Sequence, residues 1–147
     1  MYHIQYLDKK TIDYFNHKLD RCIKDKYRYS ENRVQTVNGF QTPNISNDVS
    51  IKIKKQLLKN IFKPSDISHL HLIRYNKELH THSNEIYSFI LYLNDSDGDT
   101  VFLFEDRTIF EKPKKGKMIF FNAKIPHKAK ISYKNKRVLV GALKPVV

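Results

Sequence analysis

The sequence predicts an α+β protein, mainly β, in which N-terminal helices support a body of short strands arranged as a β-sandwich or small barrel. Before Pro64, apolar residues recur at three- and four-residue spacing, which is typical of amphipathic helices. After Pro64, short segments rich in β-branched and aromatic residues are bounded by turn residues. A chain of 147 residues fits a single domain over 1–147. We expect helical support and loop over 1–65, and the β core over 66–147.

Two helices are expected in the first part of the chain. The spacing predicts one over residues 8–26, where Asp8 or Thr11 can cap the start, and one over residues 50–62, which Pro64 ends. The first presents an apolar stripe formed by Ile12, Phe15, Leu19 and Ile23. The second carries Ile51, Ile53, Leu57, Leu58 and Ile61. Each helix therefore has one face to bury against the rest of the molecule.

The β body is predicted from segments with strand composition. Six segments have it, and they span residues 69–75, 85–93, 100–104, 117–122, 127–133 and 137–143. The cluster NDSDGD at residues 94–99 predicts a turn between two of them, and the polar segment 29–48 predicts a loop or a short irregular strand. Short strands at such spacing are typical of a sandwich or barrel.

Composition restricts the environment of the chain. Its one cysteine, Cys22, cannot form an internal disulfide, which agrees with a reducing compartment. The N-terminus lacks the apolar core of a signal peptide, and no stretch approaches the roughly 20 apolar residues of a membrane span. We therefore expect a soluble cytoplasmic protein with no membrane partner.

Positive charge is concentrated in the last third of the chain. Residues 107–147 hold 12 Lys and Arg against one acidic residue, Glu111, and so carry +11 of the net charge of +12. A basic surface attracts nucleic acid or other polyanions. The alternative is a solvated surface with no specific partner.

The histidines point to a metal. His80 and His82 form a His-x-His pair, and residues i and i+2 of a strand face the same side. His127 follows a later strand and a proline-containing turn, so three imidazoles would converge on a curled sheet. The alternative is a surface histidine pair. A second pair, His69 and His71, lies within an apolar strand and is expected to line a pocket or the surface.

Arg137 is a candidate anion site. Its guanidinium suits a carboxylate because it is planar and donates two parallel hydrogen bonds. Arg137 follows His127 by ten residues across one turn, so adjacent antiparallel strands would bring the two into one cavity. It alternates with Leu139 and Gly141 and is expected to face the same side. The alternative is one more exposed cation.

The order of these motifs resembles the Fe(II)/2-oxoglutarate-dependent dioxygenases, especially the prolyl-hydroxylase-like members and their small viral and bacterial relatives. The resemblance covers residues 67–145 and rests on the joint order of RYNKELHTHSNE, FILYLNDSDGDTVFLF, PKKGKMIFF, PHKAKIS and NKRVLVGALKP. It implies a double-stranded β-helix core, which is jelly-roll or cupin-like, and a hydroxylase that uses Fe(II) as cofactor and 2-oxoglutarate as cosubstrate.

The resemblance also implies roles for particular residues. His127 is similar in position to the distal metal histidine, and Arg137 to the cation that binds 2-oxoglutarate. Tyr92, the tyrosine of YLN, is expected to contact the same carboxylate. Tyr75, ahead of the metal motif, is expected at the cosubstrate site. The catalytic residues implied are His82, His127 and Arg137.

The metal motif departs from the family pattern of His-x-Asp or His-x-Glu. If His82 is the first histidine, Asn84 occupies the carboxylate position and is a poor anionic ligand. If His80 is the first, His82 occupies that position. Glu85 is an alternative through a bulge, although strand alternation points it away from His82. We expect His80, His82 and His127 to bind the metal.

The resemblance leaves the substrate open. A peptidyl proline is the first expectation, and a nucleic acid or a protein bound to nucleic acid is the second because of the basic C-terminal segment. Two rival functions remain: a cupin-type metal protein without 2-oxoglutarate, and an inactive β-helix that serves as a binding module. The cupin does not need Arg137.

Overall fold

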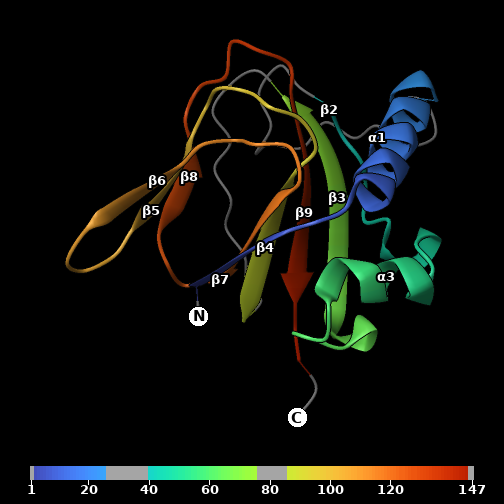
Figure 1. Ribbon diagram of the computed structural model, residues 1–147, viewed down its shortest axis with the longest axis horizontal. Helices are drawn as coiled ribbons and strands as arrows, with labels where there is room; N and C mark the ends of the chain where they lie inside the picture. The colour runs from blue at the N-terminus through green and yellow to red at the C-terminus, as the bar shows by residue number, and fades with distance from the viewer. Residues whose placement is uncertain (1, 26–39, 76–85, 146–147) are drawn as a thin grey trace.

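The computed structural model describes residues 2–25, 40–75 and 86–145, which form two β-sheets and two α-helices (Figure 1). The large sheet has the strand order β1 (Tyr2–Tyr6), β7 (Lys117–Asn122), β4 (Tyr87–Tyr92), β9 (Lys136–Leu143), β3 (Ile67–Tyr75) and β2 (Phe40–Gln41). The small sheet has the order β6 (Thr108–Glu111), β5 (Thr100–Leu103) and β8 (His127–Ala129). All pairings are antiparallel.

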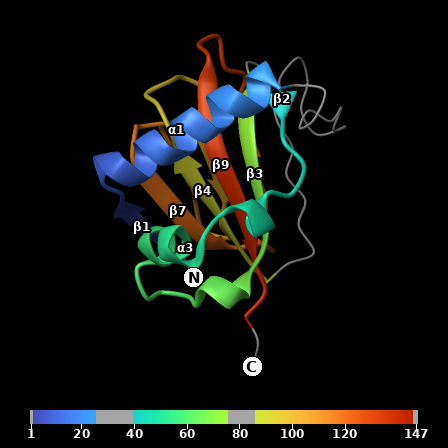
Figure 2. The ribbon, with the colours of Figure 1, turned by 90° about the vertical axis from the view of Figure 1, so that its right-hand side faces the viewer.

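Three layers stack on one another. The small sheet lies against one face of the large sheet, and α1 (Lys9–Lys24) and α3 (Ile51–Leu58) lie against the other (Figures 1 and 2). Two short 3-10 helices, η1 (Ser46–Asp48) and η2 (Pro64–Asp66), flank α3 in the chain. Two facing antiparallel sheets in this arrangement form a double-stranded β-helix, so the predicted fold class is confirmed.

Helix α1 forms where the spacing predicts it. The Asp8 side chain accepts a hydrogen bond from the backbone N–H of Thr11 at 3.0 Å, which satisfies a donor that the first turn leaves without an intrahelical acceptor. A cap of this kind is worth about 1 kcal/mol. The stripe predicted from the sequence is buried against the large sheet at Ile12, Phe15 and Leu19.

Helix α3 is shorter than predicted. The Ser50 hydroxyl caps its start by accepting from the Ile53 N–H at 3.2 Å. The helix ends at Leu58 because Lys59 and Asn60 adopt left-handed backbone conformations, with φ of 47° and 67°. The expectation that the helix continues to residue 62 is wrong, and Pro64 begins η2 rather than ending α3.

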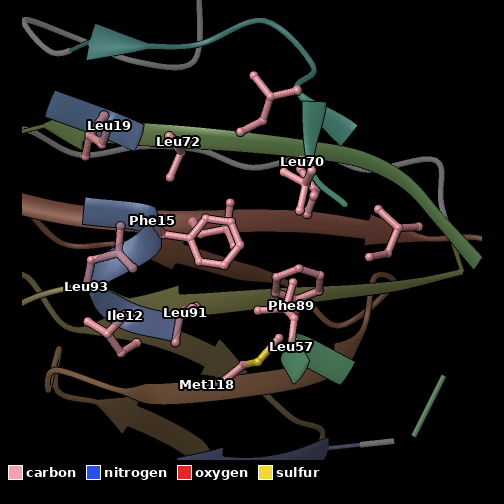
Figure 3. Close-up of a cluster of buried hydrophobic side chains, with 14 of the residues drawn as sticks. Ile12, Phe15, Leu19, Leu57, Leu70, Leu72, Phe89, Leu91, Leu93 and Met118 are labelled. Atoms are coloured by element: carbon pink, nitrogen blue, oxygen red, sulfur yellow. The ribbon is translucent and has the colours of Figure 1, made fainter. Parts of the chain in front are cut away.

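The large sheet is buried on both faces. Its helix side carries a cluster that includes Phe15, Leu72, Phe89 and Leu91 (Figure 3), and its other side carries a cluster between the two sheets. Strands covered on both faces read as continuous apolar runs rather than alternating ones, as in FILYL. The apolar run in the sequence therefore identifies these strands but does not say which residue faces which layer.

Each of the six predicted strand segments contains a strand, with β8 limited to three residues. Strands β1 and β6 were not expected, and β1 and β2 add part of the segment 1–65 to the large sheet. Within the described residues, no helix is long and apolar enough to cross a bilayer.

Candidate functional site

His127 lies at the start of β8 with its ring between the two sheets. The ring centroid is 4.7 Å from that of Phe121, edge to face, and 6.0 Å from that of Phe102. Its Nδ1 is 2.6 Å from the Ile125 carbonyl oxygen. Since a carbonyl only accepts, Nδ1 is the donor, and in the neutral tautomer Nε2 carries the lone pair. Such a backbone contact fixes the tautomer and orientation of metal-binding histidines.

The other expected metal ligands, His80 and His82, and the alternatives Asn84 and Glu85 lie outside the described residues. Among the residues that the structure does describe, no group of three His, Cys, Asp or Glu side chains could hold a metal ion. The three-histidine site therefore stays a prediction, with His127 as its one described member.

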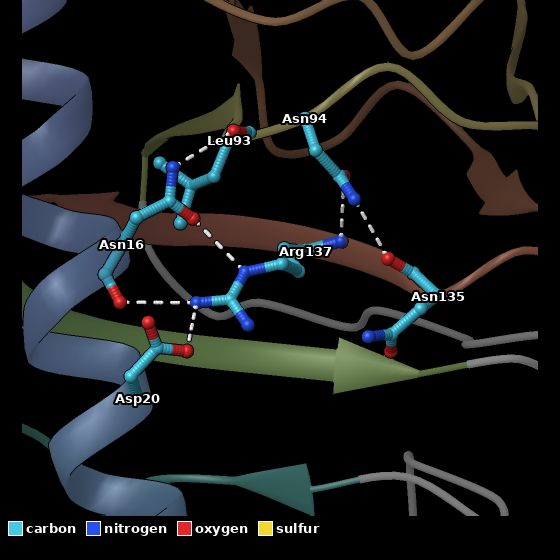
Figure 4. Close-up of polar contacts among 6 residues, drawn as sticks. All are labelled: Asn16, Asp20, Leu93, Asn94, Asn135 and Arg137. Carbon is cyan, nitrogen blue, oxygen red and sulfur yellow. Dashed lines mark hydrogen bonds and ion pairs between the residues drawn. The ribbon is translucent and has the colours of Figure 1, made fainter.

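Arg137 faces the helices. Its Nε donates to Asn16 Oδ1 at 2.9 Å, and its Nη2 donates to the Asn16 carbonyl at 3.0 Å and to Asp20 Oδ1 at 2.8 Å (Figure 4). It does alternate with Leu139, but that side of β9 packs against α1. The structure does not bring Arg137 and His127 into one cavity: the two side chains lie on opposite sides of the large sheet.

Lys136, the residue before Arg137, faces the small sheet. It is fully buried, and its Nζ donates to the Gly98 carbonyl at 2.5 Å and lies 6.0 Å from the ring centroid of Tyr92. Burial lowers the pKa of this ammonium to about 8, and the nearby carboxylates of Asp99 and Asp97 oppose the shift in part. The sequence does not single out Lys136 from the other lysines, although Lys136 follows His127 at almost the same spacing as Arg137.

Tyr92 and Thr100 complete a polar cluster with Lys136. The hydroxyls of Tyr92 and Thr100 are 2.5 Å apart, and both residues are buried. Burial is the main cause that raises the pKa of the Tyr92 phenol, so the phenol stays protonated at neutral pH. Tyr92 thus lies beside the Lys136 ammonium rather than beside Arg137, and its expected contact with a cosubstrate carboxylate stays a prediction. We call Tyr92, Thr100 and Lys136 the polar cluster.

The register of the small sheet relates the polar cluster to His127. In the pairing of β5 with β8, Phe102 lies opposite His127 and Thr100 lies opposite Ala129. These two levels are two residues apart along the strand, or about 6.8 Å. The side chains of His127 and Thr100 thus project from the same face of the small sheet, two residues apart along the strand direction.

The connections around Lys136 are fixed by Asp97. Its carboxylate accepts from the Ser132 hydroxyl at 2.7 Å and from the backbone N–H groups of Tyr133 and Lys134 at 2.9 and 3.1 Å. These hydrogen bonds, first that of Ser132, hold the pKa of Asp97 well below its usual range. Gly98 follows with φ of +80°, and a Cβ there would lie 2.9 Å from that of Ser132. The acceptor of the Lys136 ammonium is therefore held in place.

The remaining expected residues lie on β3. His69 and His71 stack with ring centroids 6.1 Å apart, and His71 Nδ1 is 2.9 Å from the Thr42 carbonyl oxygen. They share the inner side of β3 with Ile73, and His69 is exposed, which agrees with pocket or surface residues. Tyr75 pairs with Lys136 in the register of β3 and β9, and its side chain lies outside the described part of the structure.

Comparison of the sequence with protein-family models and with curated proteins finds no match. Comparison of the fold finds solved structures of two prolyl hydroxylases, of an oxidoreductase of the 2OG-Fe(II) oxygenase family and of a non-heme alpha ketoglutarate dependent epimerase. A prolyl-4-hydroxylase from Pseudomonas putida superimposes with a TM-score of 0.73 at 12% identity, over 99% of this chain and 93% of that one.

Two further solved structures have similar folds. A prolyl hydroxylase from Trichoplax adhaerens, in complex with a peptide of hypoxia inducible factor, has a TM-score of 0.71 at 10% identity, over 97% of this chain and 83% of that one. HygX from Streptomyces hygroscopicus, with nickel, 2-oxoglutarate and hygromycin B bound, has a TM-score of 0.70 at 11% identity, over 99% and 83%. At these identities the likeness establishes the fold.

Proposed function

We propose that this chain is an Fe(II)- and 2-oxoglutarate-dependent oxygenase that hydroxylates a peptide substrate. The observation that carries the proposal is the polar cluster, in which a buried ammonium lies beside two buried hydroxyls. Its member Thr100 lies two residues along the strand direction from the position of His127. The fold shared with known oxygenases supports it.

The dimensions of the polar cluster suit a five-carbon dicarboxylate. The terminal carbons of an extended five-carbon dicarboxylate are about 5 Å apart, since each C–C bond is about 1.5 Å long. The positions of His127 and Thr100 are about 6.8 Å apart along the strand direction, which is a similar length. One carboxylate would accept from Lys136, Tyr92 and Thr100 while the 2-oxo acid end lies near His127. An ammonium in a low-dielectric interior attracts an anion more strongly than one in water.

The proposal assigns the cation role to Lys136 and a structural role to Arg137. Arg137 fastens α1 to the sheet through Asn16 and Asp20. A lysine binds a carboxylate as a point charge rather than in a bidentate manner. The neutral phenol of Tyr92 can then donate to the same carboxylate.

His127 fits an iron site because its Nδ1 donates to a backbone carbonyl, so its Nε2 would be the nitrogen that binds the metal. His80 and His82 would supply the other protein ligands. When bound, the metal supplies the oxidative chemistry that couples loss of CO₂ from 2-oxoglutarate to substrate oxidation. Phe102 and Phe121 pack against the His127 ring and keep water from that side of it.

A peptidyl proline is the proposed substrate class. Two solved structures with similar folds are prolyl hydroxylases, one of them bound to a peptide. The rival cupin, which does not bind 2-oxoglutarate, does not require the buried polar cluster, and an inactive module does not require the fixed orientation of His127. The polar cluster therefore favours the oxygenase.

The test is succinate release from 2-oxoglutarate by the protein loaded anaerobically with Fe(II) and then exposed to O₂. We expect turnover by the native chain, loss of at least tenfold in affinity for 2-oxoglutarate in Lys136→Met, and no such loss in the control Arg137→Lys, which keeps the charge near α1. Absence of turnover together with absence of 2-oxoglutarate binding would refute the proposal. Equal loss of affinity in both folded variants would refute the role of Lys136.

A further inference from the structure

The outer face of the small sheet has a composition unlike that of a solvated sheet. Phe102, Ile109 and Ala129 belong to the cluster between the sheets. Because side chains alternate along a strand, the neighbours of these residues point away from the large sheet. We call this side the outer face, and its strand residues are Val101, Leu103, Thr108, Phe110 and Lys128.

Large apolar side chains are exposed on the outer face. Phe110 is 53% exposed and Leu103 is 51% exposed. Phe110 lies opposite Val101 in the register of β5 and β6, and Val101 is buried at 5% exposure. The aromatic ring is thus seated over the middle strand of a three-stranded sheet, and it still presents about half of its surface to solvent. Apolar surface of this kind is typical of binding sites.

The strand residues of the outer face carry positive charge only, whereas the turn from β5 to β6, beyond Leu103, carries the exposed Glu105 and Asp106. Lys128 projects from β8, and the exposed Lys130 and Lys112 follow β8 and β6 directly. The Lys130 ammonium lies 4.7 Å from the centre of the Phe110 ring. The structure describes every residue of β5, β6 and β8, and the one acidic side chain in these strands, Glu111, is turned inward.

Glu111 is occupied on the inner side. It accepts from the Tyr2 hydroxyl at 2.8 Å and pairs with the Lys117 ammonium at 3.3 Å, where both side chains of the ion pair are 12% exposed. It therefore contributes no negative charge to the outer face. Cations surrounding an exposed aromatic ring attract a polyanion that also carries flat apolar groups.

We propose that the outer face binds single-stranded nucleic acid. One base stacks on the Phe110 ring in the place that the Lys130 ammonium occupies in the unbound chain, and Lys130 then contacts the phosphates together with Lys112 and Lys128. Two copies of this chain packed outer face to outer face would bring their lysines together, which disfavours that arrangement. An acidic peptide would pair with the lysines but has no base to stack on Phe110, so it does not explain the exposed ring. The proposal is independent of the oxygenase chemistry, because it uses the side of the small sheet opposite His127.

The test is fluorescence anisotropy with a labelled oligothymidylate of about 12 nucleotides, a length within the range of known single-strand sites. We expect Phe110→Ala to weaken binding about tenfold and Phe110→Tyr to retain it, since the second variant keeps a stacking surface. We expect the triple variant of Lys112, Lys128 and Lys130 to Gln to reduce the slope of log affinity against log salt by about 2.

A control variant changes Lys10, Lys52 and Lys55 to Gln. These lysines are exposed on α1 and α3, on the other side of the molecule, and the variant loses the same net charge. We expect it to bind with nearly native affinity. The proposal is overturned if this control weakens binding as much as the outer-face variant, or if Phe110→Ala binds like the native chain while both keep native unfolding midpoints. Tighter binding of poly-glutamate or of anionic phosphatidylserine vesicles than of the oligonucleotide would also overturn it.

Discussion

Replacing Lys136 with Met should make the protein more stable at neutral pH. Lys136 is fully buried, and burial lowers its pKa from 10.5 to about 8. The difference corresponds to roughly 3 kcal/mol of unfavourable free energy for holding the charged form inside the folded chain. Met has a similar length without the charge, and buried charges replaced by apolar side chains often raise stability.

The net gain is smaller than the cost of the charge. The substitution leaves the Gly98 carbonyl without the Lys136 ammonium as its donor, which costs about 1 kcal/mol. We therefore expect Lys136→Met to be about 2 kcal/mol more stable than the native chain near pH 7.

The pH dependence follows from the direction of the pKa shift. Between about pH 8 and 10.5, the unfolded chain holds the Lys136 proton and the folded chain releases it. The native protein therefore gains stability as pH rises through this interval, while the Met variant gains none from this site. The advantage of the variant should shrink with rising pH and vanish near pH 10.

Urea unfolding of both proteins at pH 7, 8.5 and 10 measures this difference, because the contributions of other titrating groups cancel between them. A variant less stable than the native chain at pH 7, or an advantage that does not change with pH, would refute the reasoning. The oxygenase proposal adds that 2-oxoglutarate raises the unfolding temperature of the native chain at pH 7 and leaves that of the variant unchanged.

Two other substitutions test the packing on the helix side. Arg137→Ala should lower the free energy of unfolding by about 1–2 kcal/mol, because Asn16 loses its guanidinium partner, while the ion pair with the largely exposed Asp20 contributes little. The same variant should change the affinity for 2-oxoglutarate less than about twofold. A large loss of affinity measured by calorimetry would contradict the placement of Arg137. Gly141→Ala should lower the free energy of unfolding by about 3 kcal/mol, because the added Cβ would lie 2.1 Å from the buried Phe89 ring. Adding Phe89→Leu to the same chain should recover part of the loss. If urea unfolding finds Gly141→Ala as stable as the native chain, the packing of Gly141 against Phe89 is contradicted.

The sequence predicts the supporting helices well because their signals are local. The stripe of Ile12, Phe15 and Leu19 and the cap at Asp8 all involve residues within a few positions of one another. The end of α3 was predicted wrongly because no local signal in the sequence marks it. Lys59 and Asn60 adopt left-handed conformations without a glycine to mark the place, so the pattern in the sequence continues past the actual end.

The unexpected strands depend on distant partners. β1 pairs with β7, more than 100 residues later in the chain, and β6 pairs with β5 as the edge of the small sheet. Edge strands and short N-terminal strands carry weak periodicity because only part of each is buried. Their formation is decided by available backbone partners, which a local pattern does not reveal.

There is a physical reason why Lys136, and not the predicted Arg137, faces the His127 side of the large sheet. Arg137 shares its side of β9 with Leu139, as strand alternation predicts, but both sides of β9 are buried. Alternation alone then does not decide which of two neighbouring residues, Lys136 or Arg137, faces the side of the sheet that carries His127. A shift by one residue moves a side chain to the other face. Guanidinium chemistry favoured Arg137, whereas the layer order of the fold turns it towards α1 and turns Lys136 towards the His127 side. Two adjacent cations on β9 thus face different layers: Arg137 fastens the helix, and Lys136 remains buried at a cost in stability that an anionic ligand would offset.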